Sequence, residues 1–224
     1  MRITPPQSWD VTPREAIAIQ QALRDQVIME DQFGPLHRVG GVDVGFEEGG
    51  KITRAAVAVL SLPDLQLQET AIARRPTSFP YVPGLLSFRE TPAVLDALSQ
   101  LNTLPDLLMC DGHGLAHPRR FGIACHLGLL CDLPSIGVAK SLLVGQHVQV
   151  GETRGDWQPL LMEEDGIRLI IGAALRTRSR TKTVYVSIGH RISLETAIGI
   201  TLSCVDKYRL PEPARMAHHL ASGS

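Results

Sequence analysis

The sequence of 224 residues contains no apolar run near the roughly 18 residues that a membrane-spanning helix requires. Its start, MRITPPQSWD, lacks a cationic region followed by an apolar one, so we expect no signal peptide. Neither sign of charge predominates, because 22 Lys and Arg residues face 23 Asp and Glu residues for a net charge of -1. This balance excludes a uniformly cationic nucleic-acid coat and an acidic disordered chain, so any site for a polyanion must be local.

Cysteine and aromatic residues are also few. The four cysteines, Cys110, Cys125, Cys131 and Cys204, form no CxxC pair, and three of them lie in apolar runs. This pattern favours reduced, buried thiols and a cytoplasmic location over disulfides or a zinc knuckle. The chain has five Phe, three Tyr and two Trp residues, so a ring held in a loop stands out.

What the chain does contain is enough apolar sequence for one sizeable core. With 44% hydrophobic and 20% charged residues, we expect a single domain over residues 1–224. A helix-start pattern at Thr12 and Pro13 predicts a helix that reaches about Glu30. Short connections then predict an antiparallel meander of three strands, at residues 39–46, 55–62 and 67–73.

The second half of the chain alternates between helix and strand patterns. Helical stretches are predicted at residues 85–90 and 92–101. A strand at 107–110, a helix at 121–131 and a strand at 135–139 form a βαβ unit, which demands parallel neighbours. Strands at 168–175 and 183–188 precede a helix at 193–207, and the tail from Pro211 carries more polar chemistry than a frayed end. The prediction is an α/β fold with a mixed central sheet flanked by helices.

Three carboxylates stand where such a sheet brings residues together. Asp43 lies inside the apolar first strand, where a carboxylate needs a partner or a cation unless it points to solvent. Asp111 ends a buried central strand at its carboxyl end, where α/β sheets bind ligands, although a turn or capping role is the alternative. Glu90, which taken alone is a solvated helix residue, adds a third acid. If strands one and four are parallel neighbours, the three converge and call for a hard divalent cation that can act on phosphodiesters.

Several motifs of the chain resemble those of one family. They are GVDV at residues 41–44, PYVPGLLSFRE at 80–90, DGHG at 111–114 with HPRR at 117–120, GVAK at 137–140 and the tail YRLPEPAR at 208–215. With these motifs the chain is similar to endonuclease V, a family with a ribonuclease H-like fold that nicks nucleic acid near deaminated adenine. The matches extend over nearly the whole chain.

The resemblance implies a divalent-metal endonuclease that recognises inosine in nucleic acid, with DNA as the expected substrate and RNA as the alternative. Such an enzyme hydrolyses the second phosphodiester on the 3′ side of the lesion and leaves a 3′ hydroxyl and a 5′ phosphate. The resemblance further implies a role in DNA repair, Mg²⁺ as the cofactor with Mn²⁺ as a substitute, and a monomer.

The resemblance also assigns roles to single residues. Asp43, Asp111 and Glu90 match the family's acidic metal ligands. Lys140 matches a lysine near the scissile phosphate, where it would stabilise charge. His218 matches a tail position that holds His in some members and Asp in others. These five residues are the predicted catalytic set.

A second set is implied for the base site. Tyr81 matches the wedge of the family's Pro-Tyr-x-Pro loop, and a ring between two prolines is a good stacking group on physical grounds too. An ordinary core tyrosine is the alternative. The other predicted substrate-binding residues are Pro80, Pro83, Gly84, Leu86, Gly112, His117, Ile123, Gly137 and Ala139. Phosphate contacts are expected from Arg74, Arg75, Arg119 and Arg120, and from the basic residues of 176–182, for which a solvated strand face is an equal explanation.

Two readings from other classes compete with a magnesium nuclease. His113 and His117 have a four-residue spacing that could place two imidazoles on zinc, but Gly112, Gly114 and Pro118 break any helix there. We therefore expect His117 to line the base site or to brace the metal shell, and His113 to bond loop backbone. The other alternative is a non-catalytic nucleic-acid- or protein-binding module, which would place one of the three acids far from the others.

Overall fold

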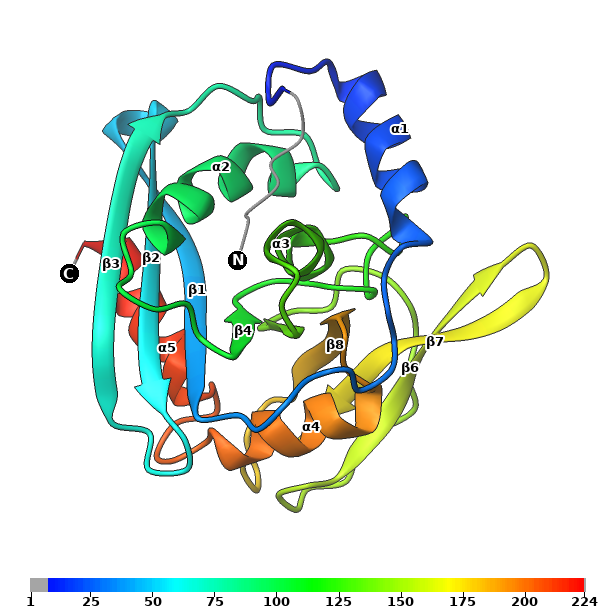
Figure 1. Ribbon diagram of the computed structural model, residues 1–224. Coiled ribbons are helices and arrows are strands. Elements are labelled where there is room, and N and C mark those ends of the chain that lie inside the picture. The colour runs from blue at the N-terminus through cyan, green and yellow to red at the C-terminus, as the bar shows by residue number, and fades with distance from the viewer. Residues whose placement is uncertain (1–7, 224) are drawn as a thin grey trace.

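The computed structural model describes residues 8–223 and is built around one mixed sheet of eight strands in the order β3-β2-β1-β4-β5-β8-β7-β6 (Figure 1). The strands are β1 (Arg38–Glu47), β2 (Ile52–Ser61), β3 (Leu67–Pro76), β4 (Leu107–Cys110), β5 (Ser135–Ala139), β6 (Trp157–Glu164), β7 (Ile167–Leu175) and β8 (Val184–His190). The helices are α1 (Pro13–Arg24), the 3-10 turn η1 (Glu48–Gly50), α2 (Leu86–Leu98), α3 (Ile123–Cys131), α4 (Leu194–Ser203) and α5 (Glu212–Ser222). The predicted α/β class and mixed sheet are confirmed.

The pairing of β1 decides where the acids lie. β1 pairs antiparallel with β2 and β2 with β3, as the short connections predict. On its other side β1 pairs in parallel with β4, and β4 with β5 through the crossover that contains α3. Val42 lies opposite Cys110 in this register. Residues 43 and 111 therefore follow side by side at the end of the pairing between β1 and β4.

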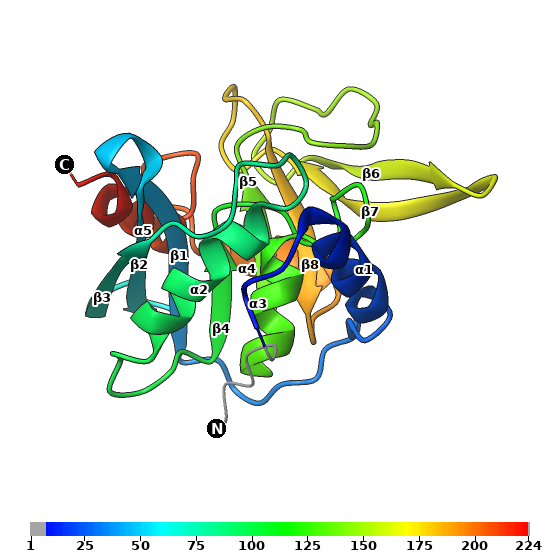
Figure 2. The ribbon, with the colours of Figure 1, turned by 90° about the horizontal axis from the view of Figure 1, so that it is seen from above.

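Helices cover both faces of the sheet (Figure 2). α2 and α3 contribute to one apolar cluster, which includes Val42 and Leu108 from the sheet. α4 and α5 contribute to another, which includes Val39 and Met109. Since adjacent residues of a strand point to opposite faces, this division follows directly from the alternation in β1 and β4.

The first two helical predictions need correction. α1 ends at Arg24 and not near Glu30, because Asp25 caps it and the Ile28 N–H turns to donate to His190 Nδ1 at 3.2 Å. The two helices predicted at 85–90 and 92–101 are one helix, α2, with Pro92 inside it. Pro92 removes one helical hydrogen bond, but buried residues on both sides of it hold the helix together against the sheet.

Two elements were missed and two boundaries were too wide. β6 is an edge strand with Pro159 and mixed polar residues, a combination that edge positions tolerate and that hides the period-two pattern. The tail from Pro211 contains the helix α5. The helix predicted from residue 121 begins at Ile123, and the one predicted to end at residue 207 ends at Ser203.

The expected burial of the cysteines is confirmed, and all four are free thiols in the structure. Burial raises the pKa of Cys204 to about 11, so its thiol stays protonated at neutral pH. Within the described part of the chain, no helix is both long and apolar enough to cross a membrane.

Candidate active site

Two aspartates from neighbouring parallel strands form the base of the site. Asp43 belongs to β1 and Asp111 directly follows β4, and the Asp111 N–H donates to the Val42 carbonyl at 2.8 Å. Both side chains are largely buried, with 14% and 12% exposed. Burial first, and then the negative charge of Asp111, raise the pKa of Asp43. The pair thus holds more negative charge than its surroundings stabilise.

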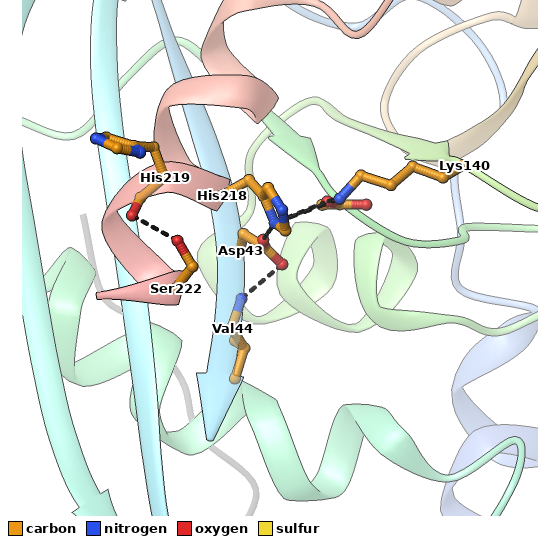
Figure 3. A network of polar contacts seen from close by, with 7 residues as sticks. Asp43, Val44, Lys140, His218, His219 and Ser222 are labelled. Carbon is orange, nitrogen blue, oxygen red and sulfur yellow. Dashed lines mark hydrogen bonds and ion pairs between the residues drawn. The ribbon is translucent and has the colours of Figure 1, made fainter. Parts of the chain in front are cut away.

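His218 of α5 contacts Asp43 (Figure 3) and lies near Asp111. Its Nδ1 donates to Asp43 Oδ2 at 2.6 Å and lies 3.9 Å from Asp111 Oδ2. One ligand atom from each of the three residues lies within 4.8 Å of the other two. Among residues 8–223 this is the one group of three such side chains that meets this criterion. Two carboxylates and an imidazole at this spacing fit a divalent cation of the Mg²⁺ or Mn²⁺ type.

Two glycines of β1 let α5 come close enough for this contact. A Cβ at Gly41 would stand 1.9 Å from the Pro213 carbonyl oxygen, and one at Gly45 would stand 2.3 Å from that of Ala221. From Pro213 to Ala221 the helix rises about 12 Å, and from Gly41 to Gly45 the strand advances about 13 Å. Helix and strand therefore advance by nearly the same distance between the two close contacts, and His218 faces Asp43 between them.

Lys140, directly after β5, contacts the same group. Its Nζ lies 2.5 Å from Asp111 Oδ2 and 3.3 Å from His218 Nδ1. Because the Nδ1 proton is donated to Asp43, the ammonium acts on His218 as a nearby charge and not through a second hydrogen bond. Lys140 thus supplies one positive charge at the edge of an acidic centre.

Glu90 of α2 lies beside this group and not within it. Burial, followed by the charges of Asp43 and Asp111, raises the pKa of Glu90 to about 8. A third carboxyl therefore experiences the same crowding of negative charge, which a divalent cation would relieve. The donor set and its electrostatics fit such a cation, with Asp43, Asp111 and His218 as its closest holders.

A cavity of about 250 Å³ opens next to Asp111 and Glu90. Tyr81 lines it with 70% of its surface exposed, so the core-tyrosine alternative is wrong. The other predicted base-site residues that line the cavity are Pro83, Gly84, Leu86, Gly112, His117 and Ile123. Besides Glu90 and Asp111, the lining residues that the sequence analysis did not assign to the base site are Ser87, His113, Gly122 and Leu143.

Three predicted base-site residues, Pro80, Gly137 and Ala139, are not among the lining residues. Gly137 lies beneath the cavity loop, because a Cβ there would stand 2.5 Å from the Gly114 nitrogen and 2.8 Å from the Gly112 carbonyl oxygen. It therefore lets that loop rest directly on β5. Ala139 is buried opposite Tyr185 in the sheet.

The Gly84 carbonyl is the point where the wedge loop is fixed. Its oxygen accepts hydrogen bonds from Gln20 Nε2 at 3.0 Å, His117 Nε2 at 2.9 Å and Arg119 Nη2 at 2.5 Å. Gly84 has a φ of 79°, a left-handed conformation that favours glycine. Gln20 is fully buried and also donates to the Phe121 carbonyl. Helix α1 thereby ties the loop that carries Tyr81 to the segment after residue 117.

The two loop histidines bind main chain. His117 donates from Nε2 to Gly84, and its Nδ1 accepts the Arg119 N–H at 3.2 Å. Burial, followed by the charge of Arg119, lowers the pKa of His117 to about 4, so this imidazole is neutral and braces the cavity wall. His113 Nε2 donates to the Ser141 carbonyl at 3.1 Å. In the described residues neither belongs to the metal-binding group, so the zinc interpretation has no geometric support.

Gln20 is a further residue of this site that the sequence analysis did not identify. The available signal was a polar side chain four positions after Ala16, on the face of α1 that the helical period buries. Such a residue is rarely buried without hydrogen-bond partners. Its partners lie in loops far along the chain, so the pattern alone could not identify them.

The sequence model that describes the endonuclease V family matches residues 21–219 of this chain. Over 223 residues the chain is 60% identical to Endonuclease V of Trichormus variabilis, a match that covers 99% of each chain. The fold is similar to the crystal structure of Endonuclease V from Streptomyces avermitilis, with a TM-score of 0.89, 44% identity and coverage of 100% of this chain and 97% of that one. It is also similar to Endonuclease V of Ciona intestinalis in complex with a 24mer DNA that contains an inosine followed by a ribo-adenosine, with a TM-score of 0.80, 28% identity and coverage of 94% and 96%.

Proposed function

The chain belongs to the endonuclease V family, and we propose that it acts in DNA repair by hydrolysing the second phosphodiester 3′ to an inosine, with Mg²⁺ as cofactor. The observation that carries the proposal is the convergence of Asp43, Asp111 and His218 beside a cavity that Asp111 itself lines. Residues 1–224 form one catalytic domain that acts as a monomer, and Mn²⁺ can replace Mg²⁺.

Asp43, Asp111 and His218 would hold the cation, with Glu90 beside them. When bound, a divalent cation supplies an activated water and charge stabilisation on the phosphate oxygens. Lys140, 2.5 Å from Asp111, is placed to steady negative charge on the scissile phosphate. Before the cation binds, the neighbouring His218 holds Asp43 in one orientation through the 2.6 Å hydrogen bond, which a bond from the imidazole to the cation would replace.

The base is selected in the cavity under Tyr81. At about 250 Å³ the cavity lies just below the roughly 300–1,000 Å³ of drug-sized pockets, which suits one extruded base. The exposed Tyr81 ring can fill the gap that the base leaves in the stack. Gly84 and Gly112, which have no side chain beyond hydrogen, line the cavity together with the braced His117.

The deciding experiment uses matched oligonucleotides, in DNA and in RNA, that carry one inosine or none. We expect Mg²⁺-dependent cleavage of the inosine strand, at the second phosphodiester on its 3′ side, and no cleavage in EDTA. A protein that binds these strands but never cuts them would be the non-catalytic module instead. That module was expected to hold one acid far from the others, whereas Asp111 is close enough to raise the pKa of Asp43, and both aspartates are close enough to raise that of Glu90.

Tyr81→Ala should lower discrimination between inosine and normal strands more than it slows the metal-dependent step. We expect a loss of about tenfold, since base stacking is worth ~1–3 kcal/mol per base. The measurement is the ratio of kcat/KM for the two strands, with Tyr81→Phe as the matched control that keeps the ring. Equal losses on both strands would show that Tyr81 serves general binding.

Gln20→Leu should weaken the same discrimination from a distance. The substitution keeps the volume but removes both donors, leaving the Gly84 carbonyl with two partners and the Phe121 carbonyl without this one. We expect a fall of about fivefold in discrimination and a loss of about 1–3 kcal/mol of stability. Gln26→Leu, on the exposed side after α1, is the control. If Gln20→Leu lowered the stability but left the discrimination between inosine and normal strands unchanged, Gln20 would have a role in folding only.

His218 variants test how the tail serves the cation. His218→Asp restores an oxygen ligand and should keep substantial Mg²⁺-dependent cleavage. His218→Ala should lose about 10–100-fold, and more with Mg²⁺ than with Mn²⁺, because Mg²⁺ tolerates departures from octahedral geometry poorly. The control is His219→Ala, whose side chain points away from Asp43 (Figure 3). If His219→Ala proves the damaging change, the assignment of the tail histidine is wrong.

A further inference from the structure

A second cavity is lined by Lys140, the residue that contacts Asp111 of the base cavity. The proposed function gives this second cavity no role. It measures about 510 Å³ and lies where β5 ends and β8 begins. We call it the β8 groove and define it by Lys140, Leu142, His147, Lys182 and Tyr185, which are among its lining residues. Its size falls within the range of ligand-binding clefts.

One loop joins the base cavity to the β8 groove. Leu143 lines the base cavity and the preceding residue, Leu142, lines the groove. Both leucines are exposed, by 45% and 43%. At the start of the same loop, Lys140 lines the groove and contacts Asp111. A strand with one base in the cavity can therefore pass the metal-binding group and continue directly into the groove.

The groove carries an excess of positive charge. Lys182 is exposed, and within residues 8–223 its ammonium group makes no hydrogen bond or ion pair. Arg176 is fixed in the wall, where it donates to the carbonyls of Val150 at 3.2 Å, Gly151 at 2.9 Å and Thr181. With Lys140, three cations face one lining carboxylate, Glu152. Lys182 is the cation left without a partner of its own, which a phosphate would supply.

Ring faces accompany these charges. The His147 ring lies 5.8 Å from that of Tyr185 at an interplanar angle of 54°, and both residues line the groove with the exposed Leu142. A cationic track next to aromatic and apolar surfaces is the combination that binds single-stranded nucleic acid, through phosphates on one side and stacked bases on the other.

We propose that the β8 groove binds the backbone and a base of the substrate strand on the 3′ side of the cut, with Lys182 as a phosphate contact. This inference rests on the proposed function, which sets the direction of the strand. Because the bond cut is 3′ to the base in the cavity, the segment that continues past Lys140 is the one that leaves with the 5′ phosphate.

The test compares two inosine-containing single strands that share one 5′ flank and differ in length beyond the cut. One ends a single nucleotide past it and the other continues for about six nucleotides, within the site sizes typical of such tracks. For the wild-type protein we expect kcat/KM to be about tenfold higher on the longer strand. Lys182→Ala should reduce this ratio to about twofold, and Lys182→Arg should restore it.

Lys51→Ala is the matched control, because Lys51 is an exposed lysine in the turn between β1 and β2, on the other side of β4 and β5 in the sheet. It should leave the long-to-short ratio unchanged. An equal ratio for wild type and Lys182→Ala, or the same fall for Lys51→Ala, would overturn the groove assignment. Dissociation constants for the two strands in EDTA give the same ratio without cleavage. A protein that cuts no inosine strand would thus refute the proposed function while the groove is still tested.

Discussion

Asp43→Ala and Asp111→Ala should each abolish cleavage of inosine-containing DNA while the fold remains as stable as before. Each removes one of three donors that lie within 4.8 Å of one another. Losing the cation's stabilisation of phosphate charge, several kcal/mol, corresponds to a rate loss on the order of 10³-fold or more. Single-turnover cleavage at saturating Mg²⁺ measures this loss.

Stability separates a catalytic aspartate from a structural one. On substitution the hydrogen bonds of Asp43 to His218 and to the Val44 N–H are lost. The substitution also removes a carboxylate whose pKa is raised first by burial and then by the charge of Asp111, and it removes one of the charges that raise the pKa of the buried Glu90. We therefore expect Tm in the absence of metal to hold or to rise. Asp64→Ala, in the exposed turn between β2 and β3, should change neither Tm nor the rate of Mg²⁺-dependent cleavage. Near-normal cleavage by Asp43→Ala or Asp111→Ala with Mg²⁺ would refute the assignment of the centre.

The convergence of Asp43 and Asp111 could be predicted from the sequence because it depends on local rules. Short connections make β1, β2 and β3 antiparallel, and the βαβ crossover makes β4 and β5 parallel. The two residues converge on the condition that the first and fourth strands are parallel neighbours, and the register of Val42 and Cys110 shows that they are. Every step except the pairing of β1 with β4 requires only periodicity and connection length.

The approach of His218 could not be predicted in this way. The resemblance to endonuclease V points to this residue, but the sequence analysis predicts no helix in the tail. Nothing in the pattern of the tail indicates which strand the helix α5 covers. The information lies instead in β1, where Gly41 and Gly45 leave no side chain on the face that Asp43 shares. Glycine inside a strand marks either a weakened strand or a place where another backbone approaches closely. Only the packed structure distinguishes these two cases. The burial of Gln20 depends likewise on loops that tertiary structure alone brings to it.

Gly41→Ala should therefore damage the active centre without changing any residue in it. The new Cβ would stand 1.9 Å from the Pro213 carbonyl oxygen and 2.9 Å from the Ala214 nitrogen, and both are backbone atoms that no rotamer change can move away. The start of α5 must shift, and overpacking of this kind costs about 3 kcal/mol, the upper end of its usual range. A displacement of about 1 Å in a catalytic group can reduce the rate on the order of 10²-fold.

The size and the selectivity of this effect test whether the glycines set the position of His218. Gly45→Ala, which meets the Ala221 carbonyl at 2.3 Å, should act in the same direction at the other end of the helix. Gly199→Ala in α4 is the matched control and should raise the free energy of unfolding. A Cβ there meets nothing within 4 Å, and alanine favours a helix by ~1 kcal/mol over glycine. The measurements are the free energy of unfolding in urea and Mg²⁺-dependent cleavage for each variant. If Gly41→Ala lost stability but kept full cleavage, α5 could move without carrying His218 away from Asp43, and the metal centre would have to be assigned to Asp43, Asp111 and Glu90 without the tail.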